Sequence, residues 1–265
     1  MTIHPTAIID KKAKLADDVE VGPYAIVGPS VEIGSKTTIG GHAVVDGNTT
    51  IGKGCSIFTG AVIGSPPQDL KYKGAKSFLK IGENNIIREY VTMNPSTDEG
   101  GVTSIGDGNL FMAYSHVAHD CKIGSDCVIA NSGTLAGHVT LEDKVVIGGL
   151  TAIHQFVRIG KMAIIGGCSK VVQDIPPFST CDGHPARVYA LNLVGLRRSG
   201  VSKDAQASLK KAFKILFHSG LTFKTGAEKV KQEIPSCGEV QYLLDFIKGS
   251  KRGMCRGEEN RSNSR

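Results

Sequence analysis

The sequence predicts a mainly β protein, built from short strands that recur every six residues and followed by an α-helical domain. Three observations predict this fold: an apolar residue at every sixth position over most of the chain, glycine directly after many of these residues, and helical periodicity after Pro176-Pro177. Neither the 3.6-residue period of a helix nor the two-residue period of a hairpin strand fits residues 3–175.

The six-residue repeat starts at Ile3 and runs to Val171. Of the 29 positions in this frame, 24 are Ile, Leu or Val, and Met93 and Phe111 are also apolar. The residue after the repeat position is Gly twelve times. A branched apolar residue followed by a small one suits a short strand that ends in a tight corner.

This pattern resembles the hexapeptide-repeat β-helix, in which three hexads make one triangular coil with Ile, Leu or Val pointing inward. The resemblance implies a left-handed parallel β-helix, against the usual right-handed preference of parallel crossovers. We therefore expect residues 1–183 to form this β-helix. Because each coil would hold three hexads, residues i and i+18 would stack in neighbouring coils, about 4.7–4.9 Å apart.

Two interruptions of the repeat predict loops. The first, near residues 65–80, contains Pro66-Pro67, and the second, near residues 94–104, contains Asn94-Pro95-Ser96. Loops that leave a rigid scaffold carry function more often than the scaffold itself does. The alternative, that the first loop is an insertion without function, stays open at this point.

The chain after the repeat is predicted to be helical. Asp182-Gly183-His184-Pro185 indicates a turn. We assign residues 184–250 to an α-helical domain, and residues 251–265, rich in Gly, Ser and charge, to a disordered tail. Helices are expected in three segments, of which the first has a clear amphipathic pattern: 203–218, 225–234 and 237–248.

Charge is divided unevenly along the chain. Residues 1–196 hold 16 Lys and Arg against 18 Asp and Glu, a balance of −2, whereas residues 197–265 hold 15 against 7, a balance of +8. The two balances sum to the net charge of +6. The basic C-terminal part would attract an acidic partner, unless it is only a solvated helical surface.

Composition argues against several classes of protein. The absence of Trp and a content of only 6% aromatic residues argue against an aromatic-platform sugar or nucleic-acid binder, because stacking needs such rings. No apolar run approaches the roughly 20 residues that span a bilayer, and the N-terminus has no secretory signal. Seven cysteines without a Cys-x-x-Cys pair favour reduced thiols. We therefore expect a cytoplasmic protein with no nucleic-acid partner and no transmembrane segment.

Four histidines gather near one column of the predicted coil. The column runs from His119 to Gly137-His138 and His154-Gln155, and His116 lies three residues before it. One interpretation is general-base catalysis by His119, whose ring Asp120 would orient. A second is a zinc site of the gamma-carbonic-anhydrase type, with His116, His119 and His138 as ligands. A third is a structural role for the histidines at a seam between subunits.

The sequence strings around this column narrow the choice. Five of them occur in order along the chain: Gln68-Asp69-Leu70-Lys71-Tyr72, Ser115-His116-Val117-Ala118-His119-Asp120-Cys121, Leu135-Ala136-Gly137-His138-Val139, Ile153-His154-Gln155-Phe156 and Asn192-Leu193-Val194-Gly195-Leu196-Arg197-Arg198. Together they resemble the acyl-carrier-protein–UDP-N-acetylglucosamine O-acyltransferases, which start lipid A biosynthesis. The resemblance runs from the first hexad to about residue 250.

The resemblance implies a reaction and its catalytic residues. A 3-hydroxyacyl chain would pass from acyl carrier protein to the 3-hydroxyl of the glucosamine in UDP-N-acetylglucosamine, with His119 as general base and no acyl-enzyme. Asp120 would support His119, and the backbone N–H of Gly137 would stabilise the tetrahedral oxyanion. No cofactor and no metal would be needed. Two alternatives remain: a zinc hydratase on the same scaffold, and acyl transfer to a 3-amino UDP-sugar.

The same resemblance implies binding residues and an assembly. Gly167 would limit acyl length, and a homotrimer with sites between neighbouring subunits is expected. Val194 and Ser199, near the implied nucleotide site, depart from the family pattern. The implied substrate-binding residues, of which the last two would contact uridine and phosphate, are Asp69, Lys71, His116, His138, His154, Gln155, Asn192 and Arg198.

Overall fold

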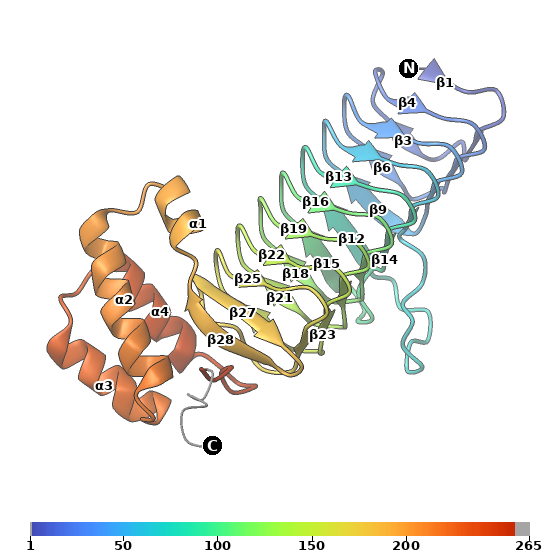
Figure 1. The fold of residues 1–265 in the computed structure, drawn as a ribbon. Coiled ribbons are helices and arrows are strands. Elements are labelled where there is room, and N and C mark those ends of the chain that lie inside the picture. Colours follow the sequence, from blue (N-terminus) through green and yellow to red (C-terminus); the bar gives the residue numbers. More distant parts are fainter. Residues whose placement is uncertain (1, 258–265) are drawn as a thin grey trace.

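Inward-pointing Ile, Leu and Val side chains form the core of a left-handed parallel β-helix in the computed structural model, which describes residues 2–257 (Figure 1). Most hexads contribute a two-residue strand whose second residue, the predicted repeat position, faces the core; Val21, Ile87 and Ile147 are all buried. Three hexads make one coil, so the strands stack into three parallel sheets that form the faces of a prism. The predicted fold is confirmed.

The three sheets, here called A, B and C, follow one another around the prism in chain order. The chain turns from A to B at the AB edge, from B to C at the BC edge, and from C to A at the CA edge. The coil strands of sheet A are β1 (Thr2–Ile3), β4 (Glu20–Val21), β7 (Thr38–Ile39), β10 (Ser56–Ile57), β13 (Ile86–Ile87), β16 (Leu110–Phe111), β19 (Val128–Ile129), β22 (Val146–Ile147) and β25 (Ile164–Ile165). Those of sheet B are β2 (Ile8–Ile9), β5 (Ile26–Val27), β8 (Val44–Val45), β11 (Val62–Ile63), β14 (Thr92–Met93), β17 (His116–Val117), β20 (Thr134–Leu135), β23 (Ala152–Ile153) and β26 (Lys170–Val171). Those of sheet C are β3 (Lys14–Leu15), β6 (Glu32–Ile33), β9 (Asn48–Ile51), β12 (Phe78–Ile81), β15 (Val102–Ile105), β18 (Lys122–Ile123), β21 (Thr140–Leu141) and β24 (Arg158–Ile159).

Stacking follows the predicted pairing of i with i+18 over the regular coils, as between Val128 and Val146. The step is longer at two places, where Val62 pairs with Thr92 and Thr92 pairs with His116. The first predicted loop therefore inserts two extra hexads into its coil, and the second inserts one. Both insertions are whole hexads, which is why the apolar repeat keeps its phase across them.

Both loops end earlier than predicted. The first loop, residues 64–77, leads from β11 into β12, and the second loop, residues 94–101, leads from β14 into β15. Each of these sheet C strands has four residues, because Leu79 and Thr103 already point into the core, where both are fully buried. The last residues of each predicted loop therefore belong to the sheet.

The glycines beside the repeat positions are required by close packing between coils. A Cβ on Gly34 would lie 2.7 Å from the carbonyl carbon of Gly52 in the next coil. The left-handed backbone conformation falls two residues later, often on residues other than glycine, such as Asp120 and His138, both with a φ of 60°. Each corner can therefore carry a functional side chain.

A hairpin closes the C-terminal end of the prism. Its strands β27 (Ser179–Gly183) and β28 (Ala186–Leu191) extend sheet A, with the predicted turn between them, and Val188 is fully buried. Residues 186–191, assigned to the helical domain from the sequence, therefore belong to the sheet. Among the described residues the N-terminal end has no such cover: β1, β2 and β3 are the outermost strands of their sheets, and the repeat residue Ile3 is exposed.

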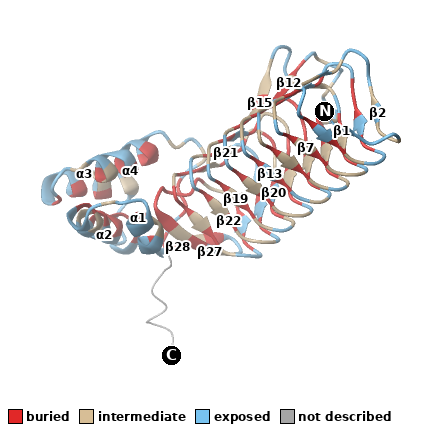
Figure 2. Ribbon diagram, turned by 90° about the horizontal axis from the view of Figure 1, so that it is seen from above, coloured by how far each residue is buried: buried red, intermediate tan, exposed pale blue. Residues whose placement is uncertain are grey.

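The helical domain packs against this closed end (Figure 2). Its predicted first helix, 203–218, is confirmed residue for residue, and the hydroxyl of Ser202 caps it by accepting from the N–H of Ala205. The other two lie within two residues of their predicted bounds. A further six-residue helix, α1, was missed because it is too short to show a helical period. The helices are α1 (Leu193–Arg198), α2 (Lys203–His218), α3 (Phe223–Glu233) and α4 (Gly238–Lys248).

The segment after α4 contradicts the predicted tail. Met254 forms a β-bridge with Asp174, Gly257 forms one with Val188, and both Met254 and Cys255 are buried. This burial and backbone pairing outweigh the polar composition that suggested disorder. The rest of the predicted tail, 258–265, lies outside the described residues. Across the described chain, none of the helices has the length and apolar character that a membrane span requires.

Candidate active site

The BC edge is the irregular edge of the prism. Both loops extend from the coils at this edge, because each lies between a strand of sheet B and a strand of sheet C. The first loop extends away from the coils and is drawn in cyan in Figure 1. The turns that follow β17, β20 and β23 carry the predicted histidine column, and these strands are neighbours in sheet B. The fold thus brings the loops and the column together.

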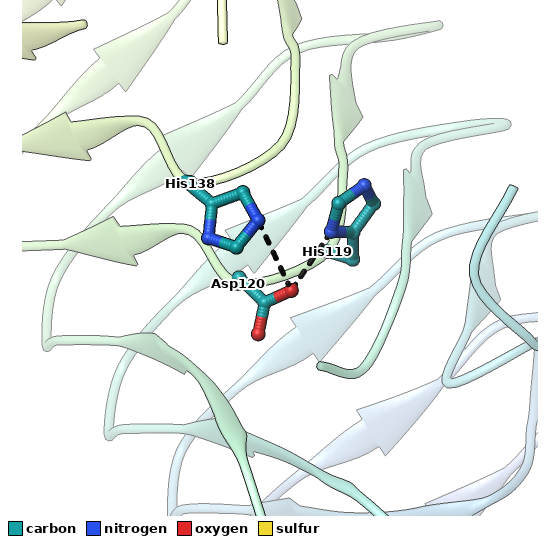
Figure 3. Close-up of side chains that lie close together, drawn as sticks. All are labelled: His119, Asp120 and His138. Atoms are coloured by element: carbon teal, nitrogen blue, oxygen red, sulfur yellow. Dashed lines mark hydrogen bonds and ion pairs between the residues drawn. The ribbon is translucent and has the colours of Figure 1, made fainter. Parts of the chain in front are cut away.

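His119 and Asp120 form a hydrogen-bonded pair at this edge (Figure 3). Nδ1 of His119 lies 2.8 Å from Oδ2 of Asp120. An ionised carboxylate can only accept, so Nδ1 is the donor, and in the neutral ring Nε2 carries the lone pair. The side chain of His119 is 14% exposed. The pair is therefore sheltered and has a basic nitrogen available on its far side.

Asp120 is held as a carboxylate by the second loop. The Ser96 hydroxyl donates to Oδ1, and the N–H and hydroxyl of Thr97 donate to Oδ2 at 3.2 and 2.8 Å. Burial is the largest single influence and raises the pKa, but the hydrogen bonds from Ser96, His119 and Thr97 together outweigh it and lower the pKa of Asp120 to about 2. Asp120 therefore stays ionised and can orient His119 and stabilise its protonated form.

Gly137 gives the His119 ring its space. A Cβ at Gly137 would collide with Cε1 of that ring. The N–H of Gly137 makes no hydrogen bond within residues 2–257. His138 follows, with its ring centroid 5.3 Å from that of His119 and its Nε2 3.7 Å from Oδ2 of Asp120. Phe156, from the next coil, stacks on the His138 ring at 4.5 Å between centroids.

The first loop brings a second carboxylate to His119. Oδ2 of Asp69 lies 3.9 Å from Nε2 of His119. Oδ1 of Asp69 accepts from the N–H of Lys71, and its carbonyl accepts from the N–H of Tyr72, so the loop closes into a turn at this point. Lys71 is exposed. Of the predicted sugar-binding pair, Asp69 thus lies beside the basic nitrogen, and Lys71 stands on the same turn with its side chain exposed.

His116 lies on β17, in the same coil as His119 and three residues before it. Its Nδ1 lies 2.6 Å from Oγ1 of Thr92 in the preceding coil. Burial, and after it the charge of His119, lower the pKa of His116 below its ordinary value. His116 is therefore held in the neutral form at neutral pH.

His154 and Gln155 continue the column one coil beyond Gly137, and both are exposed. Nη2 of Arg252 lies 3.2 Å from Nδ1 of His154. The segment that carries Arg252 is anchored by the buried Asp174, whose carboxylate accepts from the Ser250 hydroxyl at 2.7 Å. The segment that was predicted to be a disordered tail therefore places the guanidinium of Arg252 beside the histidine column.

Three predicted residues lie on other edges of the same chain. Gly167 follows β25, at the AB edge. Asn192 is buried at the CA edge, where Nδ2 donates to the carbonyl of Met162 at 2.9 Å and Oδ1 caps α1. Arg198 ends α1 and is exposed. Within the described residues, one chain therefore does not bring these three residues to His119 and Asp120.

The structure gathers a set of potential metal ligands that differs from the predicted one. One ligand atom from each of His119, Asp120 and His138 lies within 4.8 Å of the others. His116, the third predicted histidine, is not in this group within the described part of the chain and is paired with Thr92. Asp120, which replaces it, is already engaged by the second loop.

Sequence reasoning missed four side chains at this edge: Asn94, Ser96, Thr97 and Arg252. The first three stand in the second loop, so counting in steps of 18 cannot place them, and Arg252 stands in the supposed tail. One signal was available for the loop residues. The hexad count shows that both insertions follow a strand of the same sheet, and hence interrupt the same edge as His119.

Known proteins are similar to this chain in sequence and in fold. A family model described as UDP N-acetylglucosamine O-acyltransferase, domain 2, matches residues 174–255. A second, described as bacterial transferase hexapeptide repeats, matches residues 103–137. The acyl-[acyl-carrier-protein]–UDP-N-acetylglucosamine O-acyltransferase of Thermodesulfovibrio yellowstonii is 52% identical over 255 residues, which cover 96% of this chain and 99% of that protein.

Solved structures are similar over nearly the whole chain. LpxA from Acinetobacter baumannii superposes with a TM-score of 0.92 at 43% identity, covering 97% of this chain and 100% of that one. UDP-N-acetylglucosamine acyltransferase from Campylobacter jejuni gives a TM-score of 0.90 at 42% identity, with the same coverage of 97% and 100%. The similarity therefore spans both the β-helix and the helical domain.

Proposed function

Because the chain belongs to the acyl-[acyl-carrier-protein]–UDP-N-acetylglucosamine O-acyltransferase family, we propose that the BC edge is its active site and that His119 is the general base. The protein transfers an acyl chain from acyl carrier protein to UDP-N-acetylglucosamine, in lipid A biosynthesis. One observation carries the site assignment: His119 lies between two carboxylates, Asp120 at Nδ1 and Asp69 at Nε2.

In the proposed mechanism, Nε2 of His119 takes the proton of the glucosamine 3-hydroxyl. The hydroxyl oxygen then forms a bond to the thioester carbonyl carbon of the 3-hydroxyacyl carrier protein. Asp120, ionised because its pKa is about 2, stabilises the imidazolium that results. General-base catalysis of this kind contributes roughly 10²–10⁴-fold in rate. The attack is direct, so no acyl-enzyme forms.

The attack leaves a tetrahedral intermediate with negative charge on the former carbonyl oxygen. We assign the stabilisation of this oxyanion to the N–H of Gly137, which has no hydrogen-bond partner in the described chain. When the intermediate collapses, the carbon–sulfur bond breaks and the thiolate leaves. The imidazolium of His119 gives its proton to that thiolate, so the products are the acylated UDP-sugar and the free thiol of the carrier.

The remaining predicted residues divide between the sugar, the nucleotide and the acyl chain. Asp69 and Lys71 bind the sugar, and His116 and His138 support it. His154 and Gln155 lie further along the same edge, toward the nucleotide-sugar and the acyl group. The Asn192 side chain is already used as a helix cap, so exposed Arg198 is expected to contribute more to phosphate binding. Gly167 is proposed to limit acyl length.

A homotrimer would bring these parts into one cleft. His119, Gly167 and Asn192 occupy three different edges of one prism, and residues on different edges cannot line one groove. Neighbouring prisms around a three-fold axis can pair unlike edges. The AB edge also exposes large apolar side chains, as subunit interfaces do before assembly: Tyr24, Tyr90, Tyr114 and Leu150.

Mixed assembly tests the shared site. His119→Ala and Arg198→Ala are each expected to be inactive or weak alone. Unfolded together and refolded as a one-to-one mixture, they should recover about a quarter of wild-type activity, since one site in four would pair an intact His119 with an intact neighbouring Arg198. No recovery, in mixtures shown to assemble by native mass spectrometry, would place both residues in one subunit's site.

The carrier protein is proposed to dock on the helical domain. The exposed lysines of α2 and α3 make this the basic end of the molecule, and they would speed association with an acidic carrier. Added salt should then raise the KM for the carrier protein more steeply than the KM for the UDP-sugar. An equal salt dependence of the two KM values would contradict the proposed docking site.

The reaction itself is tested by transfer from a 3-hydroxyacyl carrier protein to UDP-N-acetylglucosamine in the presence of a chelator. Robust transfer to the 3-hydroxyl is the expected result. Activity only with the 3-amino UDP-sugar would replace the acceptor in the proposal. Activity that requires added zinc would point instead to the cluster of His119, Asp120 and His138.

A cytoplasmic location is also proposed, from the seven cysteines, all of which are free. Cell fractionation should find the protein with cytoplasmic markers, and recovery with periplasmic markers would contradict this.

A further inference from the structure

The second loop contacts both ends of the first loop as well as Asp120. We propose that residues 94–101 are a positioning element, in which Asn94 fixes the loop that carries Asp69 while Thr97 fixes Asp120, so that the two carboxylates stay on opposite sides of His119. This inference rests on the proposed function of His119 and Asp69. It adds two positioning residues, neither of which touches the reacting atoms.

Asn94 holds the start of the first loop. Its side chain is buried, and Nδ2 donates to the carbonyl of Ser65 at 3.0 Å and to that of Pro66 at 3.3 Å. Pro66 stands three residues before Asp69. An amide that ties down two consecutive carbonyls restricts where the chain can leave the coil. The position of Asp69 therefore depends on Asn94.

The same loop also holds the end of the first loop. The Ser77 hydroxyl donates to the carbonyl of Ser96 at 2.5 Å. The N–H of Lys76 donates to the Glu99 carboxylate at 2.8 Å, and the N–H of Gly100 donates to the carbonyl of Lys76 at 2.9 Å. Both ends of the first loop are thus fastened to the second. The first loop cannot shift along the edge without breaking several of these bonds.

The centre of the second loop holds the other carboxylate. Ser96 donates to Oδ1 of Asp120, and Thr97 donates twice to Oδ2, which also accepts from His119. Ser96 is fully buried. The two carboxylates that flank His119 are therefore positioned from one eight-residue segment. Asn94 acts on the substrate-binding carboxylate, whereas Thr97 acts on the carboxylate that orients the base.

This division predicts two different kinetic signatures. Asn94→Ala frees the first loop, so the KM for UDP-N-acetylglucosamine should rise about tenfold, the scale of losing one or two buried hydrogen bonds. Its kcat should stay within about threefold, because His119 and Asp120 are untouched. Thr97→Val keeps the shape but removes one donor to Asp120, so kcat should fall about tenfold with little change in KM. Thr97→Ser restores the hydroxyl and should restore kcat.

A second readout does not depend on activity. The first loop contains Lys71 and Lys73, and trypsin cleaves after lysines in mobile chain. In full-length Asn94→Ala, cleavage at these sites should be about five times faster than in the wild type, while Thr97→Val should match the wild type. Mass spectrometry of the fragments identifies the sites.

Asn109→Ala is the matched control. Asn109 is as buried as Asn94 and accepts from the N–H of Cys127 at 2.8 Å, but it lies on the CA edge. It should lose stability without a change in KM or in cleavage at Lys71. The proposal is overturned if Asn94→Ala leaves loop cleavage at the control rate, or if Asn94→Ala and Thr97→Val change kcat and KM in the same proportion. A wild type that transfers no acyl chain would defeat the proposed function, and the cleavage rates would still decide the role of Asn94.

Discussion

The AB and BC edges of this prism are built from the same hexad and both stack rings at their corners, yet inserted loops and a carboxylate beside a histidine occur at the BC edge. At the AB edge the corners are uninterrupted and stack aromatic rings, as between Tyr90 and Tyr114, whose centroids lie 5.3 Å apart. At the BC edge two loops are inserted and the corners carry Asp120 and His138. Both pairs occupy the same left-handed position of the hexad.

Comparing the two edges shows which features follow from the hexad repeat itself and which differ from one edge to the other. The inward residue and the left-handed corner recur at both edges, so neither marks function. A histidine at a corner is also not enough, since His42 at the AB edge stacks on Tyr24 with no carboxylate partner in the described chain. What distinguishes the BC edge is that inserted loops bring polar groups onto the corners from outside the coil.

The largest expected difference between the two edges is in how far kcat falls when one histidine is removed. His119→Ala should lower kcat about 10³-fold, because it removes the general base. His42→Ala, the control at the AB edge, should leave kcat within about twofold. Both are measured by acyl transfer under saturating substrate. Substantial transfer by His119→Ala would keep the reaction and remove His119 from its proposed role.

Replacing Gly137 tests whether the position of the His119 ring matters for the proposed reaction. A Cβ at Gly137 would displace the His119 ring, and a misplacement of about 1 Å can cost about 10²-fold in rate, so Gly137→Ala should lower kcat by that order. Gly149, the equivalent residue at the AB edge, would place its Cβ 3.2 Å from the carbonyl oxygen of Asn131, a contact that a shift of a few tenths of an ångström relieves, so Gly149→Ala should lower kcat far less. Equal activity of the two variants would mean that the ring adapts.

Acid stability tests the carboxylate at the BC edge. The pKa of Asp120 falls from 3.8 to about 2 on folding, so the ionised group stabilises the folded state by about 2 kcal/mol above pH 4. This contribution is lost as the pH falls from 4 toward 2. In urea unfolding, the stability advantage of the wild type over Asp120→Asn should therefore shrink across this range. Parallel curves would show that Asp120 has no special environment.

The smallest expected effect concerns His116. Burial lowers its pKa below 6.5, so near and below that pH the unfolded chain binds a proton that the folded chain does not. Wild-type stability should therefore decline as the pH falls below 6.5. His116→Asn should remove part of this slope, by less than the effect expected for Asp120. An unchanged slope would assign the decline to other groups.

Much of the fold and the placement of Gly137 next to His119 could be predicted because both follow from counting. The repeat identifies the inward residues, and a step of 18 residues places Gly137 beside His119 from the sequence alone. Ser96 and Arg252 could not be predicted in this way, because an inserted loop and a returning segment obey no period. The helix cap made by Asn192 could not be predicted either, because it depends on the exact start of α1, and its contact with uridine stays a prediction of the resemblance.

Among residues 2–257, the prism is capped by the hairpin at its C-terminal end and has no cover at its N-terminal end. In a solenoid each coil is held only by its neighbours, so melting spreads from whichever terminus is easiest to open. Here that terminus is the N-terminal one, where β1, β2 and β3 each pair on a single side. The coil of His119 lies several coils inward, toward the hairpin cap. Fraying from this end must therefore open several coils before it reaches His119, so loss of the first coils is expected at lower temperature than loss of the proposed site.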